Sequence, residues 1–230
     1  MFSLAIYYPL FYSKAKEKTK EYAFEENRQR QLVRLIRIQF LKRFESSARA
    51  FEMSCETLLL KFLAWVEKHS KSDAEKRRLN RWRDQNAEII GYVQQHQYEL
   101  FGKSEEEIDE DVITDEMLEE IEERSPDDYR VDEILDETYL DLDQTVRFLE
   151  ELKKFEPAHD DKLRKLTSLL KTDPVLKKHK VIIFSEYMAT ARYLQTQLGK
   201  AGIDGLDEVD SSTKRDRGDI IRQFAPYYND

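Results

Sequence analysis

Cysteine, glycine and proline are all scarce in this sequence of 230 residues. A single cysteine, Cys55, excludes an internal disulfide, and no cysteine–histidine cluster has zinc-binding spacing, so we expect a reducing compartment, the cytoplasm. Six glycines and five prolines beside 37% charged residues favour helices over a turn-rich β architecture. No apolar run approaches the roughly 20 residues of a membrane span, and we expect neither an anchor nor a signal peptide.

The net charge of −9 conceals a segregation of charge along the chain. Residues 1–103 contain 20 basic and 13 acidic side chains, whereas residues 104–143 contain 20 acidic and 2 basic side chains. The chain is therefore basic outside one acidic stretch. That stretch is either a solvated linker or insert, or a mobile segment that competes with nucleic acid for a basic surface.

The first hundred residues have a strong helical pattern. No glycine or proline occurs between Glu25 and Lys68, and apolar residues recur there at steps of three and four. The length predicts either two helices that meet near Ser46 and Ser47 or one long arm. A second helical run, 72–101, is expected to pair with the first as an antiparallel hairpin. The aromatic residues predicted to lie in the core are Phe40, Phe44, Phe51, Phe62, Trp65 and Trp82.

The remainder of the chain changes character twice. Residues 104–160 are predicted to be an acidic linker or insert that includes a helix over 132–155. From 161 onward the pattern predicts strands that alternate with helices, which is typical of a parallel α/β sheet. The expected elements are helices over 161–171, 186–200 and 213–224, and strands over 180–184 and 203–209. The predicted fold class is mainly α: a long helical hairpin or bundle over 1–103, followed by a truncated parallel α/β unit over 161–230.

Three stretches carry a family resemblance. Residues 176–187 read LKKHKVIIFSEY and resemble motif IV in the C-terminal lobe of Swi/Snf-type superfamily-two helicase-like ATPases. Residues 210–213, followed by Arg217, are similar to the Asp-Gly-Ser-Thr turn of that family, with Ser211 in place of glycine. Residues 40–47 are similar to the helical connector that precedes that lobe in bacterial members. The resemblance implies a fragment that spans this connector and the start of the second RecA-like lobe.

The resemblance also implies a function and partners. The parent would be an ATP-dependent nucleic-acid translocase that uses ATP and Mg²⁺, and this fragment would couple the lobes and contact the backbone of duplex DNA. Its partners would be the DNA and the remaining helicase lobes, and we expect the reading frame to extend on both sides. A Gly-x-x-x-x-Gly-Lys-Ser/Thr phosphate loop is absent, so we expect no cofactor in the fragment and no ATP hydrolysis by it alone.

A second hypothesis is a non-enzymatic helical module for protein interaction or regulation. Under the first hypothesis, a sheet cut after two strands would leave an open edge, so we expect self-association through residues 180–230. No catalytic residue and no metal ligand is predicted.

The predicted nucleic-acid contacts are hydroxyl, carboxyl and basic groups near helix starts and on the basic helix. Ser185 is either a helix N-cap alone or an N-cap that also binds phosphate. The arginines and lysines of the first helical run either line a DNA path or form a solvated face. The predicted contact residues are Ser185, Glu186, Ser211, Ser212, Thr213, Arg217 and Arg43. The other members of the basic helix face are Arg28, Arg30, Arg34, Arg37, Lys42 and Arg49.

Overall fold

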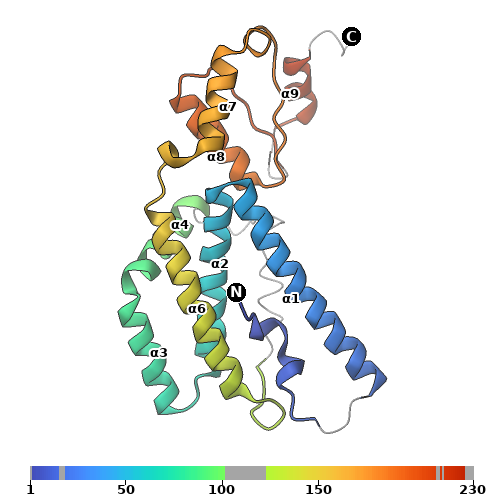
Figure 1. The fold of residues 1–230 in the computed structure, drawn as a ribbon, viewed down its shortest axis with the longest axis vertical. Helices are drawn as coiled ribbons and strands as arrows, with labels where there is room; N and C mark the ends of the chain where they lie inside the picture. The colour runs from blue at the N-terminus through green and yellow to red at the C-terminus, as the bar shows by residue number, and fades with distance from the viewer. Residues whose placement is uncertain (1, 16–18, 102–122, 211–212, 214, 226–230) are drawn as a thin grey trace. The chain divides into compact units, whose positions relative to one another are not determined.

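The computed structural model describes residues 2–15, 19–101, 123–210, 213 and 215–225, without the side chains of 97–101. The chain divides into two compact units, Met1–Lys154 (unit 1) and Phe155–Asp230 (unit 2), and each is described by itself. Within the described ranges every regular element is a helix and no strand forms (Figure 1). The predicted parallel α/β unit is therefore wrong, whereas a mainly helical chain is confirmed.

Unit 1 begins with two helices rather than one long arm. Helix α1 (Lys20–Ser46) ends where Ser47 adopts an extended backbone, and α2 (Ala48–His69) starts directly after it. The Ser47 hydroxyl oxygen accepts a hydrogen bond from the Ala50 N–H at 3.0 Å. This N-cap satisfies a free N–H of α2 and marks the break between the two helices.

The second helical run is also divided. Helix α3 (Asp73–Gln85) starts with a capping box, in which Ser72 and Glu75 bond each other's backbone N–H groups. Asn86 ends α3, and α4 (Ala87–Phe101) follows it. Leu79 and Trp82 of α3 and Val93 of α4 join the core of unit 1.

Helix α6 (Val131–Lys153) is the main packing partner of α2 and lies beside it in Figure 1. Ile134, Leu142 and Leu149 are fully buried on its inner face. The C-terminal third of the acidic stretch, 131–143, is therefore part of a core helix. Acidic residues there occupy mainly the solvent face of an amphipathic helix, and a charge count cannot separate such a helix from a linker.

The N-terminal segment packs into the same core through two short 3₁₀ helices, η1 (Ala5–Tyr7) and η2 (Pro9–Tyr12). The Asp141 carboxylate of α6 accepts hydrogen bonds from the Ser3 and Leu4 N–H groups at 2.7 and 2.6 Å. Leu4 has a left-handed backbone, with φ of 59°, and its side chain is buried. The two bonds from Asp141 hold the segment in this turn against α6.

The predicted aromatic core is confirmed with one exception. Five of the six aromatic residues are buried: Phe40, Phe51, Phe62, Trp65 and Trp82. Phe44 is 60% exposed, so its assignment to the core is wrong. It lies at the end of α1, where its ring packs edge-on against Phe51 with centroids 5.1 Å apart and otherwise faces outward.

The described residues of unit 2 form three α-helices and two short 3₁₀ helices. These are η3 (Pro157–His159), α7 (Asp161–Thr172), η4 (Leu176–Lys178), α8 (Met188–Lys200) and α9 (Arg217–Phe224). The three predicted helices of this region are confirmed, although α8 and α9 start later than expected. Its small core includes Leu163, Tyr187, Ala189 and Leu198.

Both predicted strands of unit 2 are wrong. Residues 180–184 form no ladder, and Phe184 is 91% exposed. A buried parallel strand needs neighbouring strands and helices over both faces, and the described part of unit 2 supplies no neighbouring strand. Without that partner, a β-branched apolar run remains an exposed connection. The open sheet edge on which the expected self-association rested is likewise not formed.

The described helices include none that is both long and apolar enough to span a membrane.

Candidate functional site

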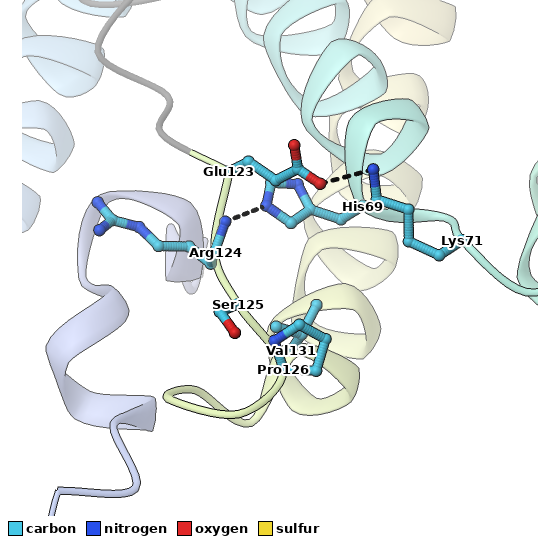
Figure 2. A pocket seen from close by; sticks show the side chains of 7 residues that line it. All are labelled: His69, Lys71, Glu123, Arg124, Ser125, Pro126 and Val131. Atoms are coloured by element: carbon cyan, nitrogen blue, oxygen red, sulfur yellow. Dashed lines mark hydrogen bonds and ion pairs between the residues drawn. The ribbon is translucent and has the colours of Figure 1, made fainter.

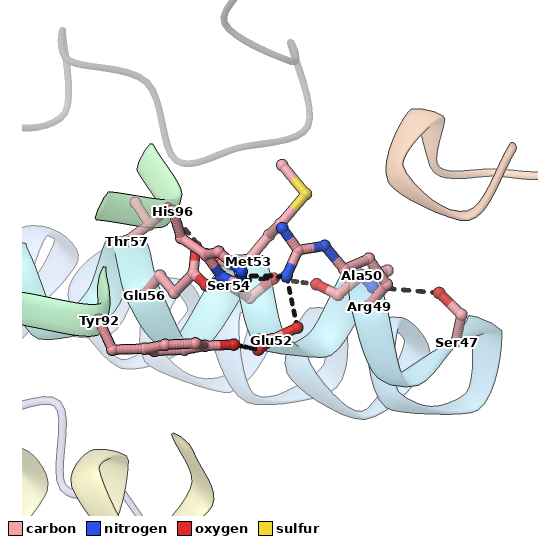
Figure 3. Close-up of polar contacts among 10 residues, drawn as sticks. All are labelled: Ser47, Arg49, Ala50, Glu52, Met53, Ser54, Glu56, Thr57, Tyr92 and His96. Carbon is pink, nitrogen blue, oxygen red and sulfur yellow. Dashed lines mark hydrogen bonds and ion pairs between the residues drawn. The ribbon is translucent and has the colours of Figure 1, made fainter. Parts of the chain in front are cut away.

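A group of buried and half-buried polar side chains lies between α2 and α4. We call Arg49, Glu52, Glu56, Tyr92 and His96 the α2–α4 polar cluster (Figure 3). Glu52 and Glu56 are four residues apart on α2, as are Tyr92 and His96 on α4. Residues at this spacing lie one above the other on one helix face, so each helix presents two polar groups to the other.

The cluster is held by short polar contacts. His96 Nδ1 lies 2.8 Å from Glu56 Oε1, and Arg49 Nη1 lies 2.5 Å from Glu52 Oε2. The Tyr92 hydroxyl donates to Glu52 Oε1. Arg49 Nη1 is also 3.3 Å from His96 Nδ1 and 3.9 Å from Glu56 Oε1. One guanidinium nitrogen of Arg49 therefore lies close to an atom of Glu52, Glu56 and His96.

Burial governs protonation in the cluster. Glu56 is fully buried, and desolvation raises the pKa of its carboxyl, an effect that His96 and Arg49 partly oppose. Desolvation and the neighbouring Glu52 also raise the pKa of the Tyr92 hydroxyl. Desolvation raises the pKa of the Cys55 thiol beside Glu56, so this cysteine is an unreactive buried group.

The same residues have the chemistry of a metal site. Glu52, Glu56 and His96 each offer one ligand atom, and the three atoms lie within 4.8 Å of one another. Carboxylate oxygens and an imidazole nitrogen are ligands for zinc and other divalent transition metals. Sequence analysis missed this group because it looked for zinc spacing only among cysteines and histidines and predicted no metal ligand. The available signal was a pair of glutamates four apart beside the core positions Phe51 and Cys55.

A second polar site is an open pocket of about 390 Å³ near the end of α2 (Figure 2). His69 Nε2 accepts the Arg124 N–H at 2.9 Å, and its Nδ1 lies 2.8 Å from the Trp65 carbonyl oxygen. These partners require a neutral ring protonated at Nδ1, and desolvation accordingly lowers the pKa of His69. His69 Nε2 thus holds the chain at Arg124, while Nδ1 is bonded within α2. The residues that line the pocket are His69, Lys71, Glu123, Arg124, Ser125, Pro126 and Val131.

The predicted nucleic-acid residues of unit 2 are engaged locally. The Ser185 hydroxyl donates to the Tyr187 carbonyl at 3.1 Å and accepts the Tyr187 N–H at 3.2 Å. It caps a turn rather than α8, which starts at Met188. Glu186 is exposed beside it. Ser211 and Ser212 lie outside the described residues.

In the turn at 210–217, the predicted contact residues Thr213 and Arg217 are bonded to Asp210 of the same unit. The Thr213 hydroxyl donates to Asp210 Oδ1 at 2.9 Å, and Arg217 Nη2 donates to the Asp210 carbonyl at 3.2 Å. Arg192 also lies 3.2 Å from the Asp210 carboxylate. The structure therefore brings Thr213 and Arg217 together at Asp210, Thr213 at its carboxylate and Arg217 at its backbone carbonyl, and this carboxylate would repel phosphate.

The basic face predicted on α1 and α2 is divided: Arg28, Arg30, Arg34 and Lys42 are exposed, whereas Arg37, Arg43 and Arg49 are buried or half-buried. Arg43 is buried. Arg28 pairs with Glu25, and Arg37 donates to the Phe2 carbonyl at 2.6 Å. Arg30 reaches the Tyr8 hydroxyl and Arg49 belongs to the polar cluster, whereas Arg34 and Lys42 are exposed.

Exposed lysines instead gather on unit 2. Residues 162–180 contain seven basic side chains and one acidic side chain, Asp173. Helix α7 and η4, which carry most of them, pack against each other. We call the exposed lysines of these two elements the unit 2 lysine surface: Lys162, Lys165, Lys171, Lys177 and Lys178. Sequence analysis missed this surface because regional sums diluted it with the acidic segment that follows it.

Comparison with protein-family models, curated proteins and solved structures finds no match to this chain.

Proposed function

We propose that this chain is a helical, non-enzymatic module that binds the phosphate backbone of duplex DNA through the unit 2 lysine surface. The observation that carries the proposal is the run 162–180, with seven basic side chains against one acidic side chain; five of the seven are exposed lysines of α7 and η4, which pack against each other. Clusters of lysine and arginine provide most of the nonspecific affinity of proteins for nucleic acid.

The distribution of ion pairs within unit 2 supports this choice of surface. Four acidic groups of this unit pair with its arginines: Glu208 and Asp210 with Arg192, Asp207 with Arg215 and Asp219 with Arg222. Lys165, Lys171, Lys177 and Lys178 lie instead on exposed positions of α7 and η4. Flexible exposed lysines can follow a backbone of regularly spaced phosphates without base-specific contacts.

The proposal keeps the DNA contact of the sequence-based hypothesis and moves it to different residues. As an extension, we propose that this chain couples the lobes of a parent protein that is an ATP- and Mg²⁺-dependent translocase. The cytoplasm is the proposed setting, consistent with the single buried, unreactive thiol of Cys55.

A salt-dependent binding experiment tests the proposal. Fluorescence anisotropy of a labelled DNA duplex is measured against the wild-type chain and the double variant Lys177→Gln/Lys178→Gln. The logarithm of the association constant should fall linearly with the logarithm of salt concentration. The slope should drop by about 0.9 for each lysine that contacts a phosphate. The matched control is Lys20→Gln/Lys76→Gln, which removes two exposed lysines of unit 1 and should leave the slope unchanged.

Deletion of part of the acidic stretch provides a second test of the proposal. A deletion should be confined to residues 104–122, because 131–143 belong to the core helix α6. Removing these acid groups should tighten DNA binding if they repel or compete with the phosphates. Failure of both the wild-type chain and the deletion variant to bind DNA would overturn the proposal and favour the protein-interaction hypothesis. Equal losses in the two lysine double variants would show that the unit 2 lysine surface is not the binding site.

A further inference from the structure

The α2–α4 polar cluster contains more ligand chemistry than a helix contact requires. We infer that Glu52, Glu56 and His96 form a binding site for a divalent transition metal, of which zinc is the first candidate, and that the metal exchanges with the guanidinium group of Arg49. This site is separate from the proposed DNA surface, since it lies in unit 1.

The backbone already places the three ligands together. Glu52 and Glu56 project from one face of α2, and His96 projects toward them from α4 (Figure 3). Their ligand atoms lie within 4.8 Å of one another, and His96 Nδ1 is 2.8 Å from Glu56 Oε1. A tetrahedral zinc ion with bonds of about 2.0–2.2 Å spaces its ligand atoms by roughly 3.3–3.5 Å. Reaching that spacing requires rotation of the three side chains.

Arg49 occupies the place of a cation between these ligands. Its Nη1 atom is 2.5 Å from Glu52, 3.3 Å from His96 Nδ1 and 3.9 Å from Glu56. The Arg49 and His96 side chains are 21% and 24% exposed, so the cluster is open to solvent on their side. The arginine can therefore leave toward water, where its charge is readily solvated, while a metal enters by the same opening.

The arginine is a poor fit for one of the ligands. A guanidinium nitrogen can only donate hydrogen bonds, so His96 Nδ1 must be unprotonated to accept one from Arg49. An unprotonated Nδ1 then faces the Glu56 oxygen, a second acceptor, at 2.8 Å. If Nδ1 instead carries the ring hydrogen, it donates to Glu56 but points a donor toward Arg49. Either way one of the two contacts of Nδ1 is mismatched.

A metal ion resolves this conflict. It accepts the Nδ1 lone pair and the carboxylate oxygens of Glu52 and Glu56 together, and Arg49 leaves the ligand atoms. Two carboxylates and one imidazole hold zinc in preference to manganese in the usual order of stability.

Zinc titration of the untagged full chain tests the inference. Isothermal titration calorimetry should show one zinc ion per chain, and Co²⁺ should give a visible absorption band in the same protein. His96→Gln should weaken zinc binding at least tenfold, since it removes a ligand. Arg49→Met removes the competing cation and should tighten binding by about tenfold, within the range that groups around a metal contribute. The matched control is His159→Gln, which removes a histidine of unit 2 and should bind zinc like the wild type.

Two outcomes would overturn the inference. One is zinc binding of equal strength by the wild type and His96→Gln, which would place the ion elsewhere. The other is the absence of zinc binding by the wild type and by an Arg49→Met variant whose circular dichroism shows native helix content. If Arg49→Met does not fold, the comparison of the wild type with His96→Gln decides alone. In that case the site is refuted when zinc binding does not depend on His96.

Discussion

The buried carboxyl of Asp141 gives unit 1 a pH dependence that a single substitution should remove. Asp141 is 2% exposed, and burial raises its pKa from 3.8 to about 6 against the opposing effect of its bonds from the Leu4 and Ser3 N–H groups. Glu137 raises the pKa further and Arg37 lowers it. A folded-state pKa above the unfolded value means that the native chain binds the proton more tightly. The resulting stability is full below the unfolded pKa and is lost as the pH rises through about 6.

The magnitude follows from the size of the shift. A shift of about 2.2 units corresponds to about 3 kcal/mol, of which about 2 kcal/mol is lost between about pH 4.5 and pH 7. Asp141→Asn cannot titrate, so the wild-type free energy of unfolding should fall relative to that of the variant by this amount. Other titrating groups, including Glu56, are common to both proteins and cancel in the difference.

Urea denaturation followed by tryptophan fluorescence is a suitable assay. Both tryptophans, Trp65 and Trp82, lie in the core of unit 1, so the signal reports on the unit that contains Asp141. A constant difference between wild type and variant across this pH range would refute the reasoning. A difference that grows in favour of the wild type as the pH rises would show that the two backbone hydrogen bonds outweigh burial and lower the pKa.

Three further substitutions have effects that can be measured by denaturation followed by circular dichroism. Ser72→Ala breaks the capping box of α3 and should cost about 1 kcal/mol; an unchanged midpoint would mean that the cap contributes nothing. Trp82→Phe removes the 2.7 Å hydrogen bond from Trp82 Nε1 to Asp143 and should cost about 1–2 kcal/mol, whereas Asp143→Ala should reproduce only the hydrogen-bond part. Phe184→Ser changes a residue that is 91% exposed and should alter stability by less than about 0.5 kcal/mol. A loss of several kcal/mol at Phe184 would instead indicate the buried strand that the structure does not contain.

The sequence pattern predicted most helices because the residues that start, continue and end a helix lie close together in the sequence. The absence of glycine and proline, the three-and-four spacing and the serine pair at the end of α1 together locate α1 and α2. Pro157 and the Asp161 region likewise bracket the end of α6 and the start of α7. Such signals act within a few residues, so sequence alone reveals them.

The strand at 180–184 shows where local pattern fails. Its β-branched apolar residues suit a buried strand, but burial depends on strands and helices elsewhere in the chain. The α2–α6 contact was missed for the same reason, because it joins residues about 80 positions apart, which no periodicity encodes. The polar cluster was only half visible: the Glu52–Glu56 spacing is local, whereas the approach of His96 depends on how α4 packs against α2.

The position of α2 between α1 and α6 also determines how the amide hydrogens of unit 1 exchange with solvent. Many α2 side chains are buried, including polar ones such as Glu56 and Lys61, so small openings of a single neighbour do not expose its backbone. Its amides should therefore exchange only when the whole of unit 1 unfolds, and their protection should equal the global stability of that unit. The helices of unit 2 have a much smaller core, and their amides should exchange through separate, lower-energy openings.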